Sequence, residues 1–201
     1  MSAARQCGLS LNRLAAALAA VVSLAAALGA CTSPPPRLYT VAAMPGPTHS
    51  GAPKVIVLRE VSLAPYLQQP PIVRSAAGYR LAVMSNDWWG EPPAAMLTRI
   101  LVDNLTQRLP GSTVLGESGA VAAPADATLE VNISRLDEAA DGQLVLQAQA
   151  AVDTKARKEP QPRNFRFAVI PSSPDVYGEV AAISTAVGQL SDALASMLAN
   201  R

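Results

Sequence analysis

The chain has 201 residues, of which half are hydrophobic and 15% are charged, and its 16 lysine and arginine residues nearly balance 15 acidic residues. This balance gives no argument for nucleic-acid binding. Two cysteines, Cys7 and Cys31, and a single histidine, His49, are too few for a zinc site, and the sequence has no P-loop, dinucleotide fingerprint or nucleophile elbow. Composition therefore favours a binding or scaffolding module over an enzyme and indicates no cofactor and no metal.

The first element is an apolar run over residues 14–28, which follows Arg5 and Arg13 and ends in Leu28-Gly29-Ala30-Cys31. A charged start, a short apolar run and small residues at its end are typical of a secretory signal peptide. The run is shorter and richer in alanine than a typical transmembrane span, which is the alternative. The cysteine after Leu-Gly-Ala resembles the lipidation site of a bacterial lipoprotein. That resemblance implies removal of residues 1–30 and attachment of diacylglycerol and of fatty acids such as palmitate at Cys31.

Residues 31–53 are rich in proline and glycine, which predicts a flexible, poorly packed tether after the lipidated cysteine. Within it, residues 37–41 alternate like a strand, so part of this tether could pair with the domain. Thr32 stands where an aspartate would mark retention at the inner membrane, so the lipoprotein resemblance implies sorting to the outer membrane. We expect the compact domain over residues 54–201.

The first half of this domain reads as strands followed by a helix. Residues 54–61 are β-branched and aliphatic and predict a buried strand, and prolines make residues 62–71 a connection. Short strands over residues 72–75 and 79–84 flank Gly78 as a hairpin. An amphipathic helix opens at Pro92 and ends before Pro110. Its apolar stripe is Leu97, Leu101, Leu105 and Leu109, and its solvent face is Arg99, Asp103, Gln107 and Arg108.

The second half predicts an antiparallel meander and a long helix. A short strand over residues 112–115 precedes three alternating segments, 129–134, 144–153 and 164–169, with a turn at Asp141-Gly142 and one apolar face that includes Phe165 and Phe167. Ser173-Pro174-Asp175 predicts a helix start with the serine hydroxyl as its cap. The apolar seam from Val176 to Met197 is predicted to pack on the chain's own sheet, and a coiled coil with a partner helix is the alternative.

Two features are candidates for a functional site. Asp137 and Glu138 are adjacent acids suited in principle to acid–base work, but beside a turn we expect a solvated loop. Trp88 and Trp89 are the only tryptophans, and adjacent residues of an extended segment point to opposite sides. We therefore expect one ring inside and one near the surface. The predicted partner-binding residues are Trp88 and Trp89 with Pro65, Tyr66 and Leu67 of the proline-rich loop; the alternative is that both rings fill the helix-to-sheet junction.

Four motifs occur in order: Leu38-Tyr39-Thr40, then VSLAPYL over residues 61–67, PIVR over residues 71–74, and NDWWGEP over residues 86–92. Together they resemble the PqiC/YmbA family of ABC-transport auxiliary lipoproteins, strongly from about residue 38 to residue 110 and diffusely thereafter. Val41 and Pro93 depart from the leucines usual in that family, and both suit the local structure. The resemblance implies a single αβα-type layered α/β domain with a mixed, largely antiparallel sheet and two main amphipathic helices.

The resemblance also implies a function: an outer-membrane-anchored lipoprotein facing the periplasm of a Gram-negative bacterium. It would act as the docking component of an MCE (mammalian-cell-entry)/ABC-type intermembrane lipid transport system associated with membrane integrity. Its implied partners are an MCE-domain protein with an ABC ATPase and permease, and a homo-oligomeric ring stays open. The alternatives are an envelope-assembly or pilotin-like structural lipoprotein, and an anchored hydrolase without a recognisable motif.

Overall fold

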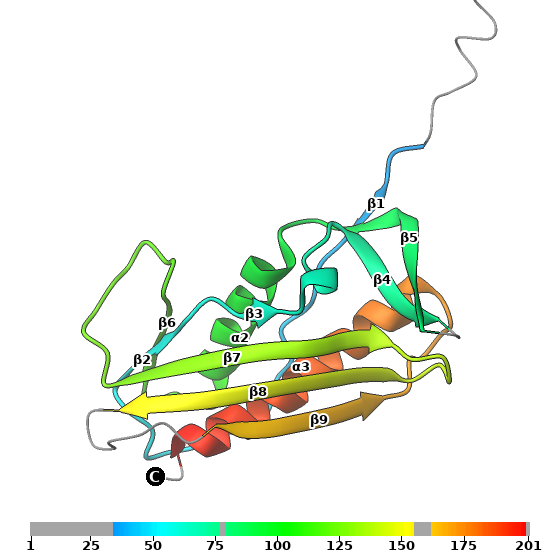
Figure 1. Cartoon of the computed structure of the whole chain (residues 1–201). Helices are drawn as coiled ribbons and strands as arrows, with labels where there is room; N and C mark the ends of the chain where they lie inside the picture. Colours follow the sequence, from blue (N-terminus) through cyan, green and yellow to red (C-terminus); the bar gives the residue numbers. More distant parts are fainter. Residues whose placement is uncertain (1–33, 77–78, 155–161, 200–201) are drawn as a thin grey trace, which may run out of the picture. The chain divides into compact units, whose positions relative to one another are not determined.

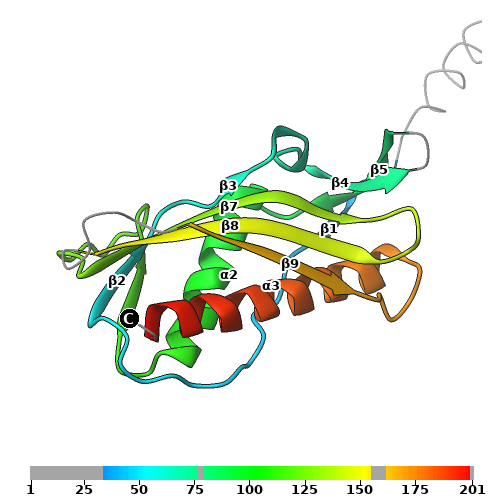
Figure 2. The same ribbon diagram turned by 60° about the horizontal axis from the view of Figure 1, so that its bottom comes forward.

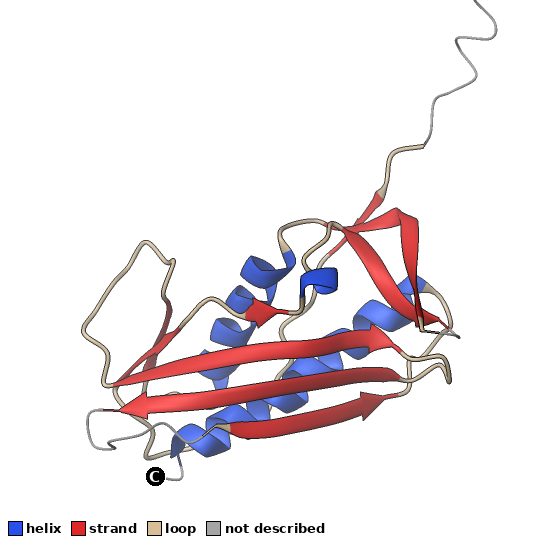
Figure 3. Cartoon of the chain, in the orientation of Figure 1, coloured by secondary structure: helices blue, strands red, loops and turns tan. Residues whose placement is uncertain are grey.

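The computed structural model describes residues 34–76, 79–154 and 162–199. From Pro36 onward the chain forms one compact unit, to which this description refers. Its described residues form two sheets and two long helices, whose arrangement is shown in Figure 1 and Figure 3. The fold class predicted from the sequence, a mixed α/β domain with two main helices, is confirmed.

The larger sheet has the strand order β6-β2-β7-β8-β9. Its short strand β2 (Val55–Leu58) runs parallel to both β6 (Thr113–Gly116) and β7 (Ala127–Glu138), and β3 (Ser62–Leu63) pairs parallel with the later part of β7. Strands β7, β8 (Leu144–Thr154) and β9 (Arg163–Val169) form the predicted antiparallel meander. Gly142 in the first turn has a φ of 81°, a conformation that glycine adopts without strain.

The smaller sheet has the order β1-β5-β4. The hairpin of β4 (Pro71–Ala76) and β5 (Arg80–Trp89) is antiparallel, and β1 (Arg37–Tyr39) joins it in parallel beside β5. Gly78, predicted to take the unusual backbone angles of this turn, lies outside the described residues. Its neighbour Tyr79 has a φ of 62° and a fully exposed side chain.

Helices α2 (Pro93–Arg108) and α3 (Val176–Ala199) lie on the same side of the meander (Figure 2). Leu101 and Leu105 of α2 and Leu190 and Leu194 of α3 are completely buried, so the α3 seam is core, as predicted. The other face of the meander carries polar side chains and is not covered by either helix, so the described chain has one helical layer rather than the two of an αβα sandwich. Phe165 and Phe167 are only partly buried, because β9 is the edge strand.

The α3 start differs in one detail from the prediction. The carboxylate of Asp175, not the hydroxyl of Ser173, caps the helix: Oδ1 of Asp175 accepts the amide of Gly178 at 2.9 Å. Ser173 instead donates its hydroxyl to the same oxygen. These two hydrogen bonds, together with the favourable helix dipole, hold the pKa of Asp175 below its usual value.

Part of the segment predicted as a flexible tether is packed. Val41 is 2% exposed and belongs to the main core. The amide of Met44 donates to Oδ1 of Asn104 on α2 at 2.8 Å, and the amide of Ala42 donates to Oγ of Ser184 on α3 at 3.1 Å. The composition of this segment suggested a loose chain, but its backbone donors find acceptors on two helices that are distant in sequence.

Arg108 is buried at 1% exposure, whereas the helical periodicity placed it on the solvent face. Its Nε donates to Oδ1 of Asp192 on α3 at 2.6 Å, and Nη1 donates to the carbonyl of Met44 at 2.8 Å. Nη2 donates to the carbonyl of Gly188 at 3.2 Å, and the backbone carbonyl of Arg108 accepts the amide of His49 at 2.7 Å. The prediction failed because these acceptors come from α3 and from the N-terminal segment, which helical periodicity within α2 cannot reveal.

We expect Arg108→Ala to lower the free energy of unfolding by about 3 kcal/mol or more, because truncation empties a fully buried site and removes the hydrogen bonds to Asp192 and to the carbonyl of Met44. Arg99→Ala is the matched control on the same helix. Arg99 is 47% exposed and pairs with Glu91 and Asp103, so its truncation should cost less than about 1 kcal/mol. Urea denaturation of both variants measures the difference, and equal losses would show that the Arg108 contacts do not stabilise the fold.

Candidate functional site

The small sheet places the two tryptophans on opposite faces. Leu38 of β1 and Pro71 of β4 both lie opposite Trp88 of β5, so these three side chains form one row across the sheet. Trp88 is 36% exposed and Leu38 is 66% exposed. Trp89 points the other way and packs against both hydrophobic clusters of the core. The prediction of one inner and one outer ring is therefore confirmed.

Hydrogen bonds hold the outward ring and its neighbouring strand in place. The indole Nε1 of Trp88 donates to the carbonyl of Ser85 at 3.1 Å. On the inner side, Arg37 of β1 reaches both oxygens of the Asp87 carboxylate, at 2.8 and 3.0 Å. Burial alone would raise the pKa of Asp87, but hydrogen bonds from Arg37 and Tyr39 outweigh it and lower the pKa. The exposed ring therefore sits on a rigid support.

The proline-rich loop forms a single turn of 3₁₀ helix, η2 (Pro65–Leu67). Pro65 is exposed, and Leu67 packs against the core. Tyr66 is half-buried and donates its hydroxyl to Oδ2 of Asp137 at 2.6 Å; burial and this bond raise its pKa. Of the five predicted partner-binding residues, Trp89 and Leu67 therefore contribute to the core, while Trp88, Pro65 and Tyr66 reach the surface.

We expected Asp137 and Glu138 to lie in a solvated loop, and this expectation is wrong. Both belong to a charged cluster that contacts Tyr66 of η2. Strand β7 continues through both residues, and Asp137 is 1% exposed. Its carboxylate accepts hydrogen bonds from Tyr66, from Ser75 at 2.9 Å and from Arg135 at 3.1 Å. The alternation of the strand over residues 129–134 could have been extended to Asp137, which is the signal that the expectation missed.

Glu179 of α3 completes this cluster and was not predicted. It is completely buried, and its Oε2 accepts a hydrogen bond from Nε of Arg74 on β4 at 2.6 Å. Arg74 also lies 3.6 Å from Glu138. Burial raises the pKa of Glu179, the charges of Glu138 and Asp137 add to this, and Arg74 opposes it. The cluster thereby joins the small sheet to β7 and to α3.

The space beside Glu179 is too small for a substrate. It is a cavity of about 20 Å³, lined mainly by apolar side chains of the turn, the small sheet and both helices. Such a volume holds about one water molecule. Across the described ranges, no group of three potential ligands is placed to hold a metal ion. The geometry gives the cluster a structural role.

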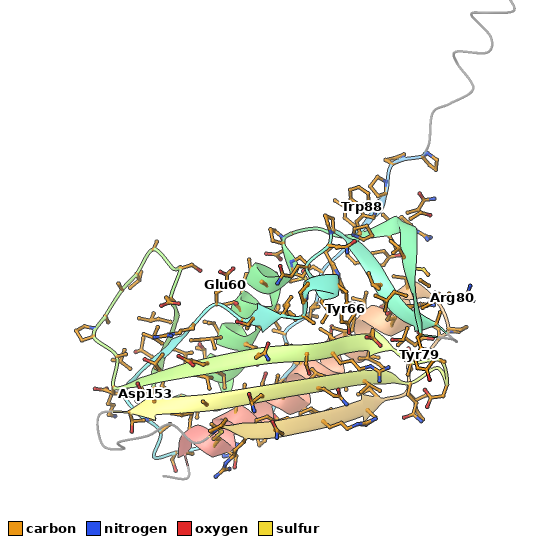
Figure 4. The ribbon with its side chains drawn as sticks, viewed as in Figure 1. Glu60, Tyr66, Tyr79, Arg80, Trp88 and Asp153 are labelled. Atoms are coloured by element: carbon orange, nitrogen blue, oxygen red, sulfur yellow. The ribbon has the colours of Figure 1, made fainter. Side chains whose placement is uncertain are left out.

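A wider, open groove lies beside β3 and the residue that follows η2. It has a volume of about 560 Å³ and runs between the β3 segment and the start of α2. Its lining combines the exposed residues Glu60, Ser62, Gln68 and Pro92 with the partly buried Ala94. Figure 4 shows Glu60 and Tyr66 at the two sides of the β3 segment. An open, mixed surface of this kind suits contact with another protein.

Comparison with known proteins identifies a family. The family model described as ABC-type transport auxiliary lipoprotein component matches residues 38–195. No curated protein matches the chain. Among the part of the chain that the structure describes, no helix has the length and hydropathy needed to cross a membrane.

Two solved structures share the fold. One is described as an uncharacterized protein and has a TM-score of 0.70 at 19% identity. The match covers 82% of this chain and 99% of the chain of that protein. The other is the protein XCC0632 from Xanthomonas campestris, family DUF330, with a TM-score of 0.66 at 19% identity, covering 80% of this chain and 93% of its own. At this identity the likeness shows the fold.

The raised pKa of Glu179 predicts a pH dependence of stability. The folded state binds this proton more tightly than the unfolded chain, whose value is about 4.5, so stability falls as pH rises from 4.5 through the raised folded pKa. Glu179→Gln should remove this decline. The free energy of unfolding of the variant, relative to that of the wild type, should therefore rise by up to about 1.4 kcal/mol per pH unit in that window. Denaturant unfolding between pH 4.5 and 8 measures the difference.

The exposed variant Glu130→Gln is the control and should parallel the wild type throughout, since Glu130 is 51% exposed. Asp87 and Asp175, with lowered pKa values, titrate below their usual 3.8 and so outside this window. A Glu179→Gln curve parallel to that of the wild type would contradict the prediction.

Proposed function

The chain belongs to the family of ABC-type transport auxiliary lipoproteins, as its motifs indicated, and from this premise we propose that it is an outer-membrane-anchored periplasmic docking component. It serves an MCE/ABC-type intermembrane lipid transporter. The observation that carries the proposal is the family match, which extends from β1 into α3 and so includes both sheets and both helices. The cavity beside Glu179, at about 20 Å³, has no room for an acyl chain.

The membrane anchor in this proposal is Cys31, which lies outside the described residues. Acyl chains contribute about 0.8 kcal/mol per buried methylene, and several chains on one cysteine give stable attachment. Only five residues separate Cys31 from Arg37, where β1 begins. The chain that follows β1 is hydrogen-bonded to both helices, so tension on the anchor is borne by the core rather than by a loose tether.

The transporter contact in this proposal is the surface formed by Pro65 and Tyr66 with the adjoining groove. Aromatic side chains held in a fixed position are the usual anchors of protein interfaces. Tyr66 fits that role because its hydroxyl is held by Asp137 while part of its ring reaches the surface. The partner is an MCE-domain protein; an ATPase and a permease supply the energy, and this chain needs no cofactor. The free edges of β6 and β9 offer strand pairing for a homo-oligomeric ring.

Anchoring is tested with Cys31→Ser, expressed from the full-length chain. We expect this variant to lose fatty-acid labelling and to leave the membrane fraction while its domain stays folded, because Cys31 precedes the packed unit. Cys7→Ser is the matched control and should be labelled and retained like the wild type, since Cys7 lies in the predicted signal peptide. Label on the Cys31→Ser protein would rule out lipidation at this site.

Docking is tested by co-purification of the lipidated chain with its MCE-domain protein, ATPase and permease. We expect Tyr66→Ala to weaken the complex by about 2 kcal/mol, roughly thirtyfold in affinity. Tyr177→Ala is the control, because Tyr177 is 72% exposed and belongs to the first turn of α3, not to η2 or the groove. Thermal stability is measured in parallel, since Tyr66 also bonds to Asp137. Equal recovery of the complex with both variants, at equal stability, would exclude the turn as the contact.

A further inference from the structure

Exposed large hydrophobic side chains of the described residues gather on the small sheet. Eight such side chains are exposed in that part of the chain, and five of them belong to β1, β5 or the turn between β4 and β5. These five are Leu38, Tyr79, Leu81, Val83 and Trp88. Figure 4 shows Tyr79 and Trp88 at the two ends of the sheet, from the hairpin turn to β1. We call these five side chains the outer face of the small sheet.

The strand register places the four members that belong to strands on one side of the small sheet, namely Leu38, Leu81, Val83 and Trp88. Alternate residues of β4, namely Pro71, Val73 and Ser75, pair with Trp88, Val83 and Leu81 of β5. Alternate residues share a face, so their partners do as well. On β4 this face is covered by the rest of the domain, since Val73 is 7% exposed and the hydroxyl of Ser75 donates to the buried Asp137; the exposed part of the face is carried by β1 and β5. The register is irregular between the first two pairs, so Trp88 lies on the same side as Val83 although four residues lie between them in the sequence. Leu38 pairs with Trp88 and extends the face onto β1.

The opposite side of the same sheet is core. Tyr39, Met84 and Trp89 pack there against Ile72 and against Val176 and Val180 of α3. The outer face is therefore not the unfilled half of the domain's own core. A contiguous apolar surface of this kind marks contact with a partner or a membrane.

The residue types of the outer face suit a lipid surface. Tryptophan and tyrosine are enriched where a protein meets lipid headgroups, because their rings are apolar at one end and polar at the other. The acidic residue of the three strands, Asp87, is buried at 5% exposure and paired with Arg37 on the inner side, so it does not place a charge on the outer face.

The position of the anchor brings this surface to the membrane. Seven peptide units join Cys31 to Leu38, and they span about 25 Å at most. A domain of this size has a radius of gyration of about 15 Å, so its far end lies beyond that reach when its near end is at the membrane. Pro34, Pro35 and Pro36 favour an extended and rather stiff connection. The small sheet is thus the part of the domain held closest to the lipid.

We propose that the outer face of the small sheet lies in the headgroup region of the membrane that holds Cys31. The inference rests on the lipid anchor of the proposed function and not on the transporter. Trp88 and Tyr79 contact the lipid directly, and this second contact fixes one orientation of the domain on the membrane. The turn at Tyr66 and its groove are separate from this face and stay available to the transporter.

The test uses the lipidated full-length protein reconstituted in vesicles of phosphatidylethanolamine with a minor fraction of phosphatidylglycerol, some carrying bromine on the acyl chains. In Trp89→Phe the remaining ring is Trp88. Its emission should shift to shorter wavelength on reconstitution, be quenched by the brominated lipid and resist aqueous acrylamide. In Trp88→Phe the remaining ring is Trp89, which faces the core and should show none of these changes. If Trp89→Phe unfolds, the difference between wild type and Trp88→Phe gives the same readout.

A second pair of variants separates lipid contact from simple proximity. Leu81→Asp places a charge on the outer face and should abolish most of the lipid quenching of Trp88. Ile170→Asp is the control, because Ile170 is 80% exposed next to β9 and outside this face, and it should leave the quenching intact.

The proposal is wrong if acrylamide quenches the fluorescence of Trp88 and brominated lipid does not. Protection of Trp88 that appears only at high protein concentration or after addition of the MCE-domain protein would also overturn it, since either result assigns the face to a protein contact. Flotation of the vesicles reports the anchor independently: protein that fails to float shows that the lipid anchor of the proposed function is wrong. Protein that floats with an unquenched Trp88 shows that only the orientation is wrong.

Discussion

The fold depends on one buried guanidinium. Arg108 ends α2 and donates hydrogen bonds to a carbonyl of α3, to the carboxylate of Asp192 and to the carbonyl of Met44 in the N-terminal segment. Each acceptor would be costly to bury without a donor. A Cβ on Gly46 would overlap the guanidinium, so the chain can pass here only because this residue has no side chain. A single side chain thus joins both helices to the segment that follows β1.

A second polar cluster gives the small sheet a fixed place on the rest of the domain. Arg74 reaches from β4 to Glu179 of α3 and Glu138 of β7, and Asp137 binds Tyr66 of the turn and Ser75 of the small sheet. Burial of three carboxylates beside two arginines is tolerated because nearly every charge has a close opposite partner. Turn η2 and the small sheet are therefore held in one arrangement. In the two proposals made above, the surface at η2 contacts the transporter and the outer face of the small sheet contacts lipid.

This arrangement agrees with the family's description as an ABC-type transport auxiliary component. A chain of this family needs attachment to a membrane and a surface for the transporter, and neither requires a metal or a large cavity. The shared fold of relatives at 19% identity shows that the layering of sheet and helices tolerates wide changes in side chains.

The sequence by itself determined the meander, both helices, the opposite directions of Trp88 and Trp89, and the family, because periodicity and short motifs are local properties. Only the tertiary structure decided that Arg108 and Asp137 are buried, since a charged residue enters a core when partners from distant segments converge on it. The same reason explains the proline-rich segment after β1, whose backbone donors are satisfied by α2 and α3. Local patterns state which face of an element is apolar, but the partner that covers it is decided by packing.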